Sequence, residues 1–217
     1  MPLSSHRTPR SVAQSGFTMI EVLITFVVLV IGLLGLIGLQ ARTQQAELES
    51  YQRGQALVLL QDILDRMNAH RLDAKGGFYT TGTSTPLGGG GALTDCSTLT
   101  APNLNSKRDL CEWGNLLKGA AEVATGGTCD ASSGAKCIGA MLDARGCITY
   151  DAGSELPDSS GTAIAGTGIH TVTIAWQGVS AGATALSTNL CGKNLYPSED
   201  QRRVVTATLR IGALRAQ

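Results

Sequence analysis

The chain has 217 residues, with 17 basic and 17 acidic side chains and therefore no formal net charge. Neutrality and the lack of a basic run exclude the electrostatic pattern of a nucleic-acid-binding protein, so no nucleic-acid partner is expected. Charged residues make up 16% of the chain and are scarce in the first 40 residues, which excludes an evenly mixed globular protein.

The N-terminal part consists of a short polar segment followed by a long apolar one. Residues 1–16 carry two arginines, one histidine and two prolines but no acid, which argues against a packed element. Residues 17–39 contain one charged residue, Glu21. As a helix they would cover roughly 34 Å, enough to span a bilayer. A secretory signal peptide would have a shorter apolar core and a better cleavage site than Leu39-Gln40-Ala41.

Glu21 is the feature that neither a signal peptide nor a plain membrane anchor explains. A carboxylate inside the hydrocarbon region costs on the order of 2.5–3.5 kcal/mol, so it usually has a partner. No Lys, Arg or His lies between Phe17 and Ala41. Cleavage after Gly16 would create an α-amine at Phe17, four residues before Glu21 on the same helix face. The alternative is that Glu21 lies near the membrane surface and extends toward water.

Residues 16–23, with the sequence GFTMIEVL, resemble the class III signal of type IV prepilins. That signal has a short basic leader ending in Gly, then Phe, then Glu as the fifth residue of the mature chain, then a long apolar run. The resemblance implies cleavage between Gly16 and Phe17 by prepilin peptidase and N-methylation of Phe17. It also implies assembly of the helix into a filament core, with Glu21 as the charge-pairing residue.

Helical character is expected to continue to about Leu72. From residue 56 onward, apolar residues recur with a period of 3.6 and predict an amphipathic helix that packs on a sheet; they include Leu59, Leu60, Ile63 and Met67. Asp62 and Arg66 are spaced i, i+4 and are expected to pair on the solvent face. Glycines at positions 76 and 77 end the pattern.

The remainder of the chain indicates a small sheet with long loops. Period-two alternation predicts strands over residues 147–150, 170–176 and 203–211, and places His170 as a strand-edge residue. Residues 76–106, rich in Gly, Thr and Ser, are expected to form a long loop, and residues 107–118 a short helix.

This pattern is similar to the pilin fold, an α+β arrangement with a long N-terminal helix on a small antiparallel β-sheet and long disulfide-bonded loops. Residues 64–67 and the last two strands also resemble minor pilins of the PilV type. The expected segments are a leader (1–16), a membrane-spanning or filament-core helix (17–39), an amphipathic half of that helix (40–75) and a periplasmic domain (76–217).

The six cysteines all lie beyond the apolar helix and form no C-x-x-C motif, which favours disulfides over a zinc site. Six cysteines allow 15 pairings. Neighbours in the sequence suggest the pairs Cys96–Cys111, Cys129–Cys137 and Cys147–Cys191.

No catalytic residue, metal site or cofactor is expected, because the chain contains no Gly-x-Ser-x-Gly, Walker or H-E-x-x-H motif. The leading hypothesis is a minor pilin that primes or modifies a type IV pilus, with other minor and major pilins, prepilin peptidase and the inner membrane as partners. It would cross the inner membrane once with its N-terminus in the cytoplasm, and would support twitching, adhesion or DNA uptake. The alternatives are a type II secretion pseudopilin and a membrane-tethered binding domain that never polymerises.

Overall fold

The computed structural model describes residues 16–90, 93–100, 102–121, 141–182, 185 and 187–212. The predicted leader up to residue 15, together with Cys129 and Cys137, lies outside the described residues. The chain divides into two compact units, Met1–Gln44 and Gln45–Gln217. Helix α1, Met19–Ala69, continues from the first unit into the second over 51 residues, as its lack of proline permits.

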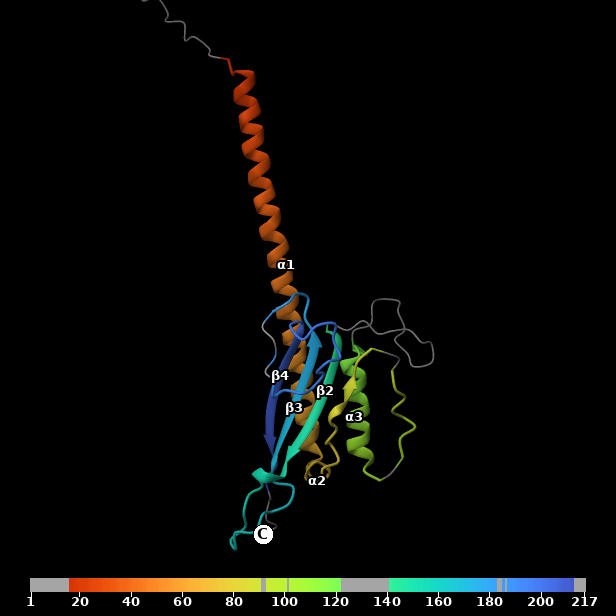
Figure 1. Cartoon of the computed structure of the whole chain (residues 1–217). Coiled ribbons are helices and arrows are strands. Elements are labelled where there is room, and N and C mark those ends of the chain that lie inside the picture. Colours follow the sequence, from red (N-terminus) through yellow and green to blue (C-terminus); the bar gives the residue numbers. More distant parts are fainter. Residues whose placement is uncertain are drawn as a thin grey trace, which may run out of the picture. The chain divides into compact units, whose positions relative to one another are not determined.

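The second unit contains a four-stranded antiparallel sheet in the order β1-β2-β3-β4 (Figure 1). Its strands are β1 Gly82–Gly88, β2 Leu142–Asp151, β3 Ile169–Gln177 and β4 Arg202–Arg210. Three helical elements accompany them: α2 Arg71–Lys75, α3 Leu104–Leu117 and the short 3₁₀ helix η1 Ala152–Ser154. The α+β pilin-like arrangement expected from the sequence is therefore confirmed.

The prediction of a continuous loop over residues 76–106 is wrong, because strand β1 lies within this segment. The segment lacks alternation of apolar and polar residues, and its pairing with β2 shifts register between Gly82 and Leu87. The Thr81 hydroxyl accepts a hydrogen bond from the Ile148 amide at 3.0 Å, where strand pairing begins. Pairing with β2, rather than local sequence preference, makes this segment a strand.

The main core lies between the sheet and the second half of α1. Alternate residues of β3, among them Val172 and Ile174, are fully buried on this face, and α1 contributes its predicted stripe: Ala56, Leu60, Ile63 and Met67. Helix α3 adds Trp113, whose Nε1 donates a hydrogen bond to the Leu59 carbonyl at 2.9 Å. The 3.6-residue period of α1 therefore sets which face of the helix the sheet covers.

A second cluster covers the opposite face of the sheet. Cys147 and Ala175 are buried there beneath Cys191 and Tyr196, which belong to the β3–β4 connection. The Tyr196 hydroxyl donates a hydrogen bond to the Asp143 carbonyl at 3.2 Å. Strand β3 is consequently covered on both faces, although its alternation predicted burial on one face only.

The buried side chain of Arg202, the first residue of β4, binds backbone carbonyls of this connection. Its side chain is 1% exposed and donates hydrogen bonds to the carbonyls of Asn189 and Cys191, at 3.0 and 3.2 Å. Glu199 supplies the counter-charge at 2.7 Å. A buried guanidinium is tolerated here because acceptors surround it.

The prediction that His170 is a strand-edge residue is wrong. His170 is fully buried in β3, which is a central strand, and its Nε2 lies 3.2 Å from the Ala74 carbonyl of α2. Its ring packs against Tyr150, with ring centroids 4.7 Å apart. The order of the strands, which no local pattern reports, places this histidine in the core.

Candidate functional site

The segment around the predicted cleavage point is open and non-helical. Gly16, Phe17 and Thr18 precede α1 without regular structure, and Phe17 is 84% exposed. The Thr18 carbonyl accepts hydrogen bonds from the amides of Glu21 and Val22, which starts the helix. No atom lies within 4 Å of a Cβ built on Gly16. The bond between Gly16 and Phe17 therefore lies in an accessible segment outside regular structure.

Glu21 lies in the first turn of α1. Amide groups without helical acceptors and the positive end of the helix dipole favour a carboxylate at this position. In the described part of the chain its carboxylate makes no ion pair, and the sequence supplies no basic residue between Phe17 and Arg42. An α-amine at Phe17 would provide a positive group within one helical turn.

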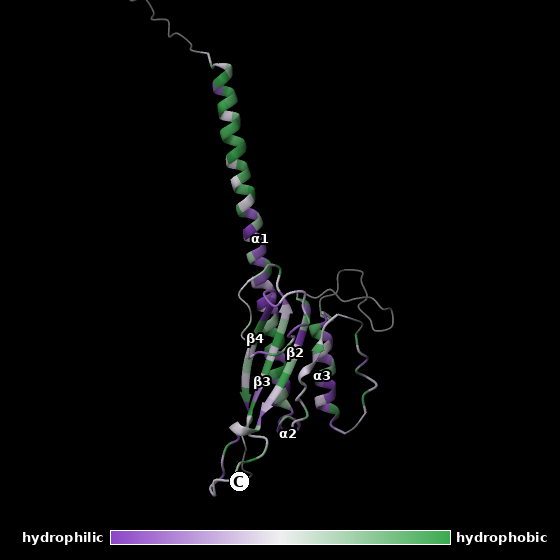
Figure 2. Cartoon of the chain, viewed as in Figure 1, coloured by the Kyte–Doolittle hydropathy of each residue, from purple (hydrophilic) through white to green (hydrophobic). Residues whose placement is uncertain are grey.

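Apart from Glu21, the first half of α1 is predominantly apolar, as its mostly green colour in Figure 2 shows. Its large side chains from Met19 to Leu39 are all exposed, for example Met19 at 92% and Phe26 at 70%. Among the described residues, α1 is the one helix that is long and apolar enough to cross a membrane by length and composition. A helix that is hydrophobic all round requires lipid or other helices as its surroundings.

A polar cluster joins the second half of α1 to α3. Asp109 of α3 accepts hydrogen bonds from the Tyr79 hydroxyl and from Arg66 at 3.3 Å, and lies 2.7 Å from His70 Nδ1. Burial and the bond to Asp109 raise the pKa of Tyr79 well above its usual value, so the phenol stays neutral and donates. The cluster fixes the two helices together.

The predicted pair between Asp62 and Arg66 is present, with a distance of 3.0 Å between Arg66 Nε and Asp62 Oδ2. The pair does not lie on an open solvent face, as was predicted. Arg66 also contacts Glu112 of α3 at 2.6 Å, and the Arg66 side chain is 25% exposed. Sequence reasoning missed the cluster because its acids lie more than 40 residues after Arg66. No local spacing reports such a contact.

Among the described residues, two disulfides hold loops of the second unit. Cys96 is joined to Cys111, and Cys147 to Cys191, the same pairs that sequence order suggested. The first ties the segment before α3 to that helix, and the second ties the β3–β4 connection to β2. Within the residues that the structure describes, no group of three or more His, Cys, Asp or Glu is arranged to hold a metal ion.

Residues 12–37 match the family model of the prokaryotic N-terminal methylation motif. The chain therefore carries a prepilin signal of the type IV pilin kind, and this supports a place among the type IV pilins or pseudopilins. Such a signal indicates a structural, non-enzymatic protein. It implies processing by prepilin peptidase, anchoring in the membrane and assembly with other pilins. No curated protein and no solved structure matches the chain.

Proposed function

We propose that the chain is a minor pilin that helps to initiate or modify a type IV pilus. The precursor crosses the inner membrane once, with its N-terminus in the cytoplasm and residues 76–217 in the periplasm. Prepilin peptidase cleaves between Gly16 and Phe17, and Phe17 is N-methylated. The helix over residues 17–39 then leaves the lipid and enters the filament core, where it contacts other minor and major pilins.

The observation that carries this proposal is the carboxylate of Glu21, unpaired among the described residues, in the otherwise apolar and exposed first half of α1. A charge at that depth costs a few kcal/mol unless it is paired. Pairing with the Phe17 amine of the same or a neighbouring subunit offsets the cost and sets the axial position of the incoming helix. In a tethered protein whose helix stays in the lipid, a carboxylate at position 21 would only add an energetic cost.

The test is quantitative blotting of membrane and sheared-surface fractions from cells expressing Glu21→Val at the wild-type level. Insertion and processing should persist, because the cleavage site is unchanged, while the amount in sheared filaments should fall sharply. Thr25→Val, which removes a hydroxyl bonded to the Val22 carbonyl but no charge, is the matched control and should be incorporated normally. Equal incorporation of Glu21→Val would contradict the proposal.

A pseudopilin of type II secretion would undergo the same N-terminal processing. The phenotype of a strain in which the gene is deleted distinguishes this alternative from a minor pilin. Loss of pili or twitching with normal secretion supports the pilus assignment. Loss of protein secretion with intact pili would assign the chain to the secretion system instead.

A further inference from the structure

A groove of about 530 Å³ lies on the face of the sheet that is turned away from α1. Its floor includes Thr173 of β3, which alternates along the strand with Val172 and Ile174 of the main core. Six threonines line the groove, from all four strands and from the β3–β4 connection: Thr83, Thr149, Thr171, Thr173, Thr188 and Thr206. We call it the threonine groove. Its volume lies within the range of about 300–1,000 Å³ that is usual for small-molecule sites.

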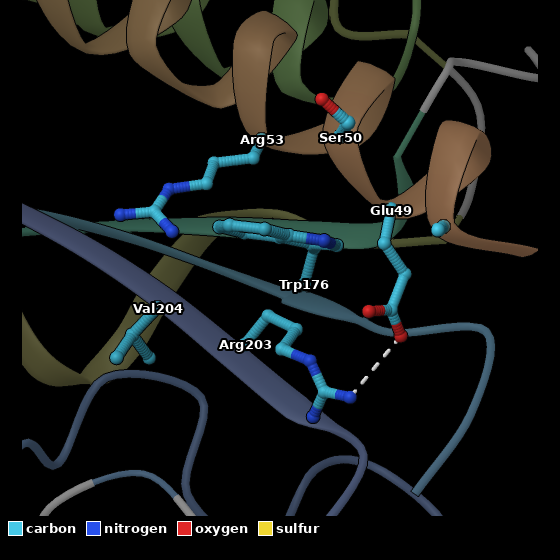
Figure 3. Close-up of a pocket in the computed structure, with 7 residues that line it drawn as sticks. Glu49, Ser50, Arg53, Trp176, Arg203 and Val204 are labelled. Atoms are coloured by element: carbon cyan, nitrogen blue, oxygen red, sulfur yellow. Dashed lines mark hydrogen bonds and ion pairs between the residues drawn. The ribbon is translucent and has the colours of Figure 1, made fainter. Parts of the chain in front are cut away.

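A different groove, between α1 and the β4 side of the sheet, shows by contrast what is special here (Figure 3). There the acid is already satisfied, because Glu49 accepts a hydrogen bond from Arg203 at 3.2 Å, drawn as the dashed line, and another from the Ser180 hydroxyl at 3.0 Å. The threonine groove has no charged side chain among the described residues that line it. Hydrogen bonding, and not charge, therefore decides what it can bind.

The threonine groove offers hydrogen bonds that the protein itself does not use. The hydroxyls of Thr83, Thr171 and Thr188 make no hydrogen bond among the described residues. Thr173 and Thr206 share one hydrogen bond, at 3.1 Å between their hydroxyl oxygens, so one of their two protons remains without an acceptor in that pair. Each of these hydroxyls can both donate and accept. They match a ligand whose own polar groups also do both.

One wall of the threonine groove is held in place from two sides. Asn189 Oδ1 accepts a hydrogen bond from the Cys191 amide at 3.2 Å, and Asn189 Nδ2 donates one to the Thr206 hydroxyl at 3.2 Å. The second N–H of that amide group is left to offer. The disulfide between Cys147 and Cys191 ties the wall to β2, and Leu190, 48% exposed, adds an apolar surface. A wall that is ordered before a ligand arrives loses little conformational entropy on binding.

This lining discriminates between classes of ligand. A phosphate, a carboxylate or a nucleic acid would require cations, and a metal ion would require carboxylates, but the described lining has neither. A lipid chain would leave the hydroxyls without partners. An extended peptide adds to a sheet at its edge, whereas β2 and β3 are paired on both sides. A saccharide without charge meets every condition, because its hydroxyls donate and accept while the C–H groups of its ring pack against Leu190.

We propose that the threonine groove binds an uncharged saccharide. The ligand takes hydrogen bonds from Thr83, Thr171 and Asn189 and lies with one ring face against Leu190. This inference rests on the proposed function, and deepens it by naming a class of ligand. In that function α1 faces the filament core, so the opposite face of the sheet is turned outward, where a saccharide on another surface can reach it.

The test is binding of the full-length protein to immobilised saccharides. The detergent must have no sugar headgroup, because such a headgroup would compete for the groove. Lactose, cellobiose and diacetylchitobiose are the neutral probes, while sialyllactose, which is lactose with an added carboxylate, and a short DNA duplex are the charged probes. The protein should retain at least one neutral probe and should bind neither charged probe more strongly.

Thr171→Val and Thr83→Val keep a β-branched side chain, and each removes a hydroxyl that has no partner among the described residues. Each should weaken binding of the retained neutral probe about fivefold, the effect of one hydrogen bond worth about 1 kcal/mol. Thr208→Val is the matched control. Thr208 is exposed and lies opposite Thr171 in the sheet but does not line the groove, so its variant should bind like the wild type.

Failure to bind any neutral probe, or stronger binding of a charged one, would overturn the inference. Unchanged binding by Thr171→Val, or an equal loss in Thr208→Val, would overturn it as well. Processing at Gly16 and incorporation into sheared filaments are measured separately, by blotting. A processed and incorporated protein that binds no saccharide leaves the minor-pilin proposal standing, whereas a protein that binds saccharide but never enters filaments would contradict that proposal and not the groove.

Discussion

The indole ring of Trp113 lies directly against Gly146. A Cβ built on Gly146 would meet the ring carbons at less than any allowed contact distance, and would also lie 2.7 Å from Leu117. Trp113 is fully buried and donates its hydrogen bond to the backbone of α1. The missing side chain at Gly146 therefore allows α3 to dock on β2 while Trp113 reaches across to α1.

Replacement of Gly146 by alanine should destabilise the second unit by about 1–3 kcal/mol, because the surrounding core has no room for a methyl group. Both tryptophans lie in that unit, so urea unfolding of the full chain in detergent, followed by tryptophan fluorescence, measures the change. Gly54→Ala is the control, since a Cβ there meets nothing within 4 Å, and it should raise stability by up to about 1 kcal/mol. Equal stability of Gly146→Ala and wild type would show that α3 can move away without cost.

The two described disulfides should contribute unequally. Cys147 and Cys191 are 44 residues apart and both 1% exposed, whereas Cys96 and Cys111 are 15 apart and half-buried. Chain entropy predicts about 4 kcal/mol for the first and about 3 kcal/mol for the second. The double alanine variants of each pair, unfolded in urea under oxidising conditions, test this order. A larger loss from the Cys96–Cys111 pair would contradict it.

The stability of the second unit should decrease as the pH falls below about 6.5, the ordinary pKa of an unfolded histidine. Burial lowers the pKa of His170 in the folded state, although the hydrogen bond to Ala74 opposes this, and its Nδ1 has no partner. The unfolded chain thus binds the proton more readily, so this contribution is complete above pH 6.5 and is lost as the pH falls toward the lowered pKa.

Gln can keep the hydrogen bond to Ala74 without titrating, so His170→Gln isolates the effect. The difference in unfolding free energy between wild type and His170→Gln should shrink or reverse between pH 8 and pH 5. Parallel curves for the two proteins over that range would show that His170 does not titrate differently on unfolding.

Processing of the precursor should depend on the absence of a side chain at position 16. Gly16→Val adds a side chain into open space, so the fold should be unaffected while the peptidase subsite is blocked. Blotting and N-terminal sequencing should find only full-length precursor in the membrane. Gly38→Val, also in open space, should be processed normally. Mature protein beginning at Phe17 in the Gly16→Val cells would refute the assigned cleavage point.

The sequence predicted those elements whose pattern is local. The stripe at Leu60, Ile63 and Met67 defined the buried face of α1, and β3 and β4 extend only one residue beyond the predicted range at their N-terminal ends. Strand β1 was not predicted, because apolar and polar residues do not alternate over Gly82–Gly88. This segment forms a strand because it pairs with β2.

Burial of polar residues could not be predicted for a related reason. Whether His170 lies at an edge or in the centre depends on strand order, and the environment of Arg66 depends on α3, more than 40 residues away. The ion pair between Arg203 and Glu49 likewise depends on where β4 lies relative to α1. The prepilin signal, in contrast, is contiguous, and it could be identified from the basic leader, residues 16–23 and the apolar run that follows them.

Arg202 has a further consequence for how the chain can vary. Because the buried side chain of Arg202 and the disulfide at Cys191 hold residues 189–191 of the β3–β4 connection in place, the exposed side chain of Leu195 is not needed for this task. Substitutions there should accumulate without disturbing the sheet. This exposed segment can thus change in sequence while the second unit keeps its fold.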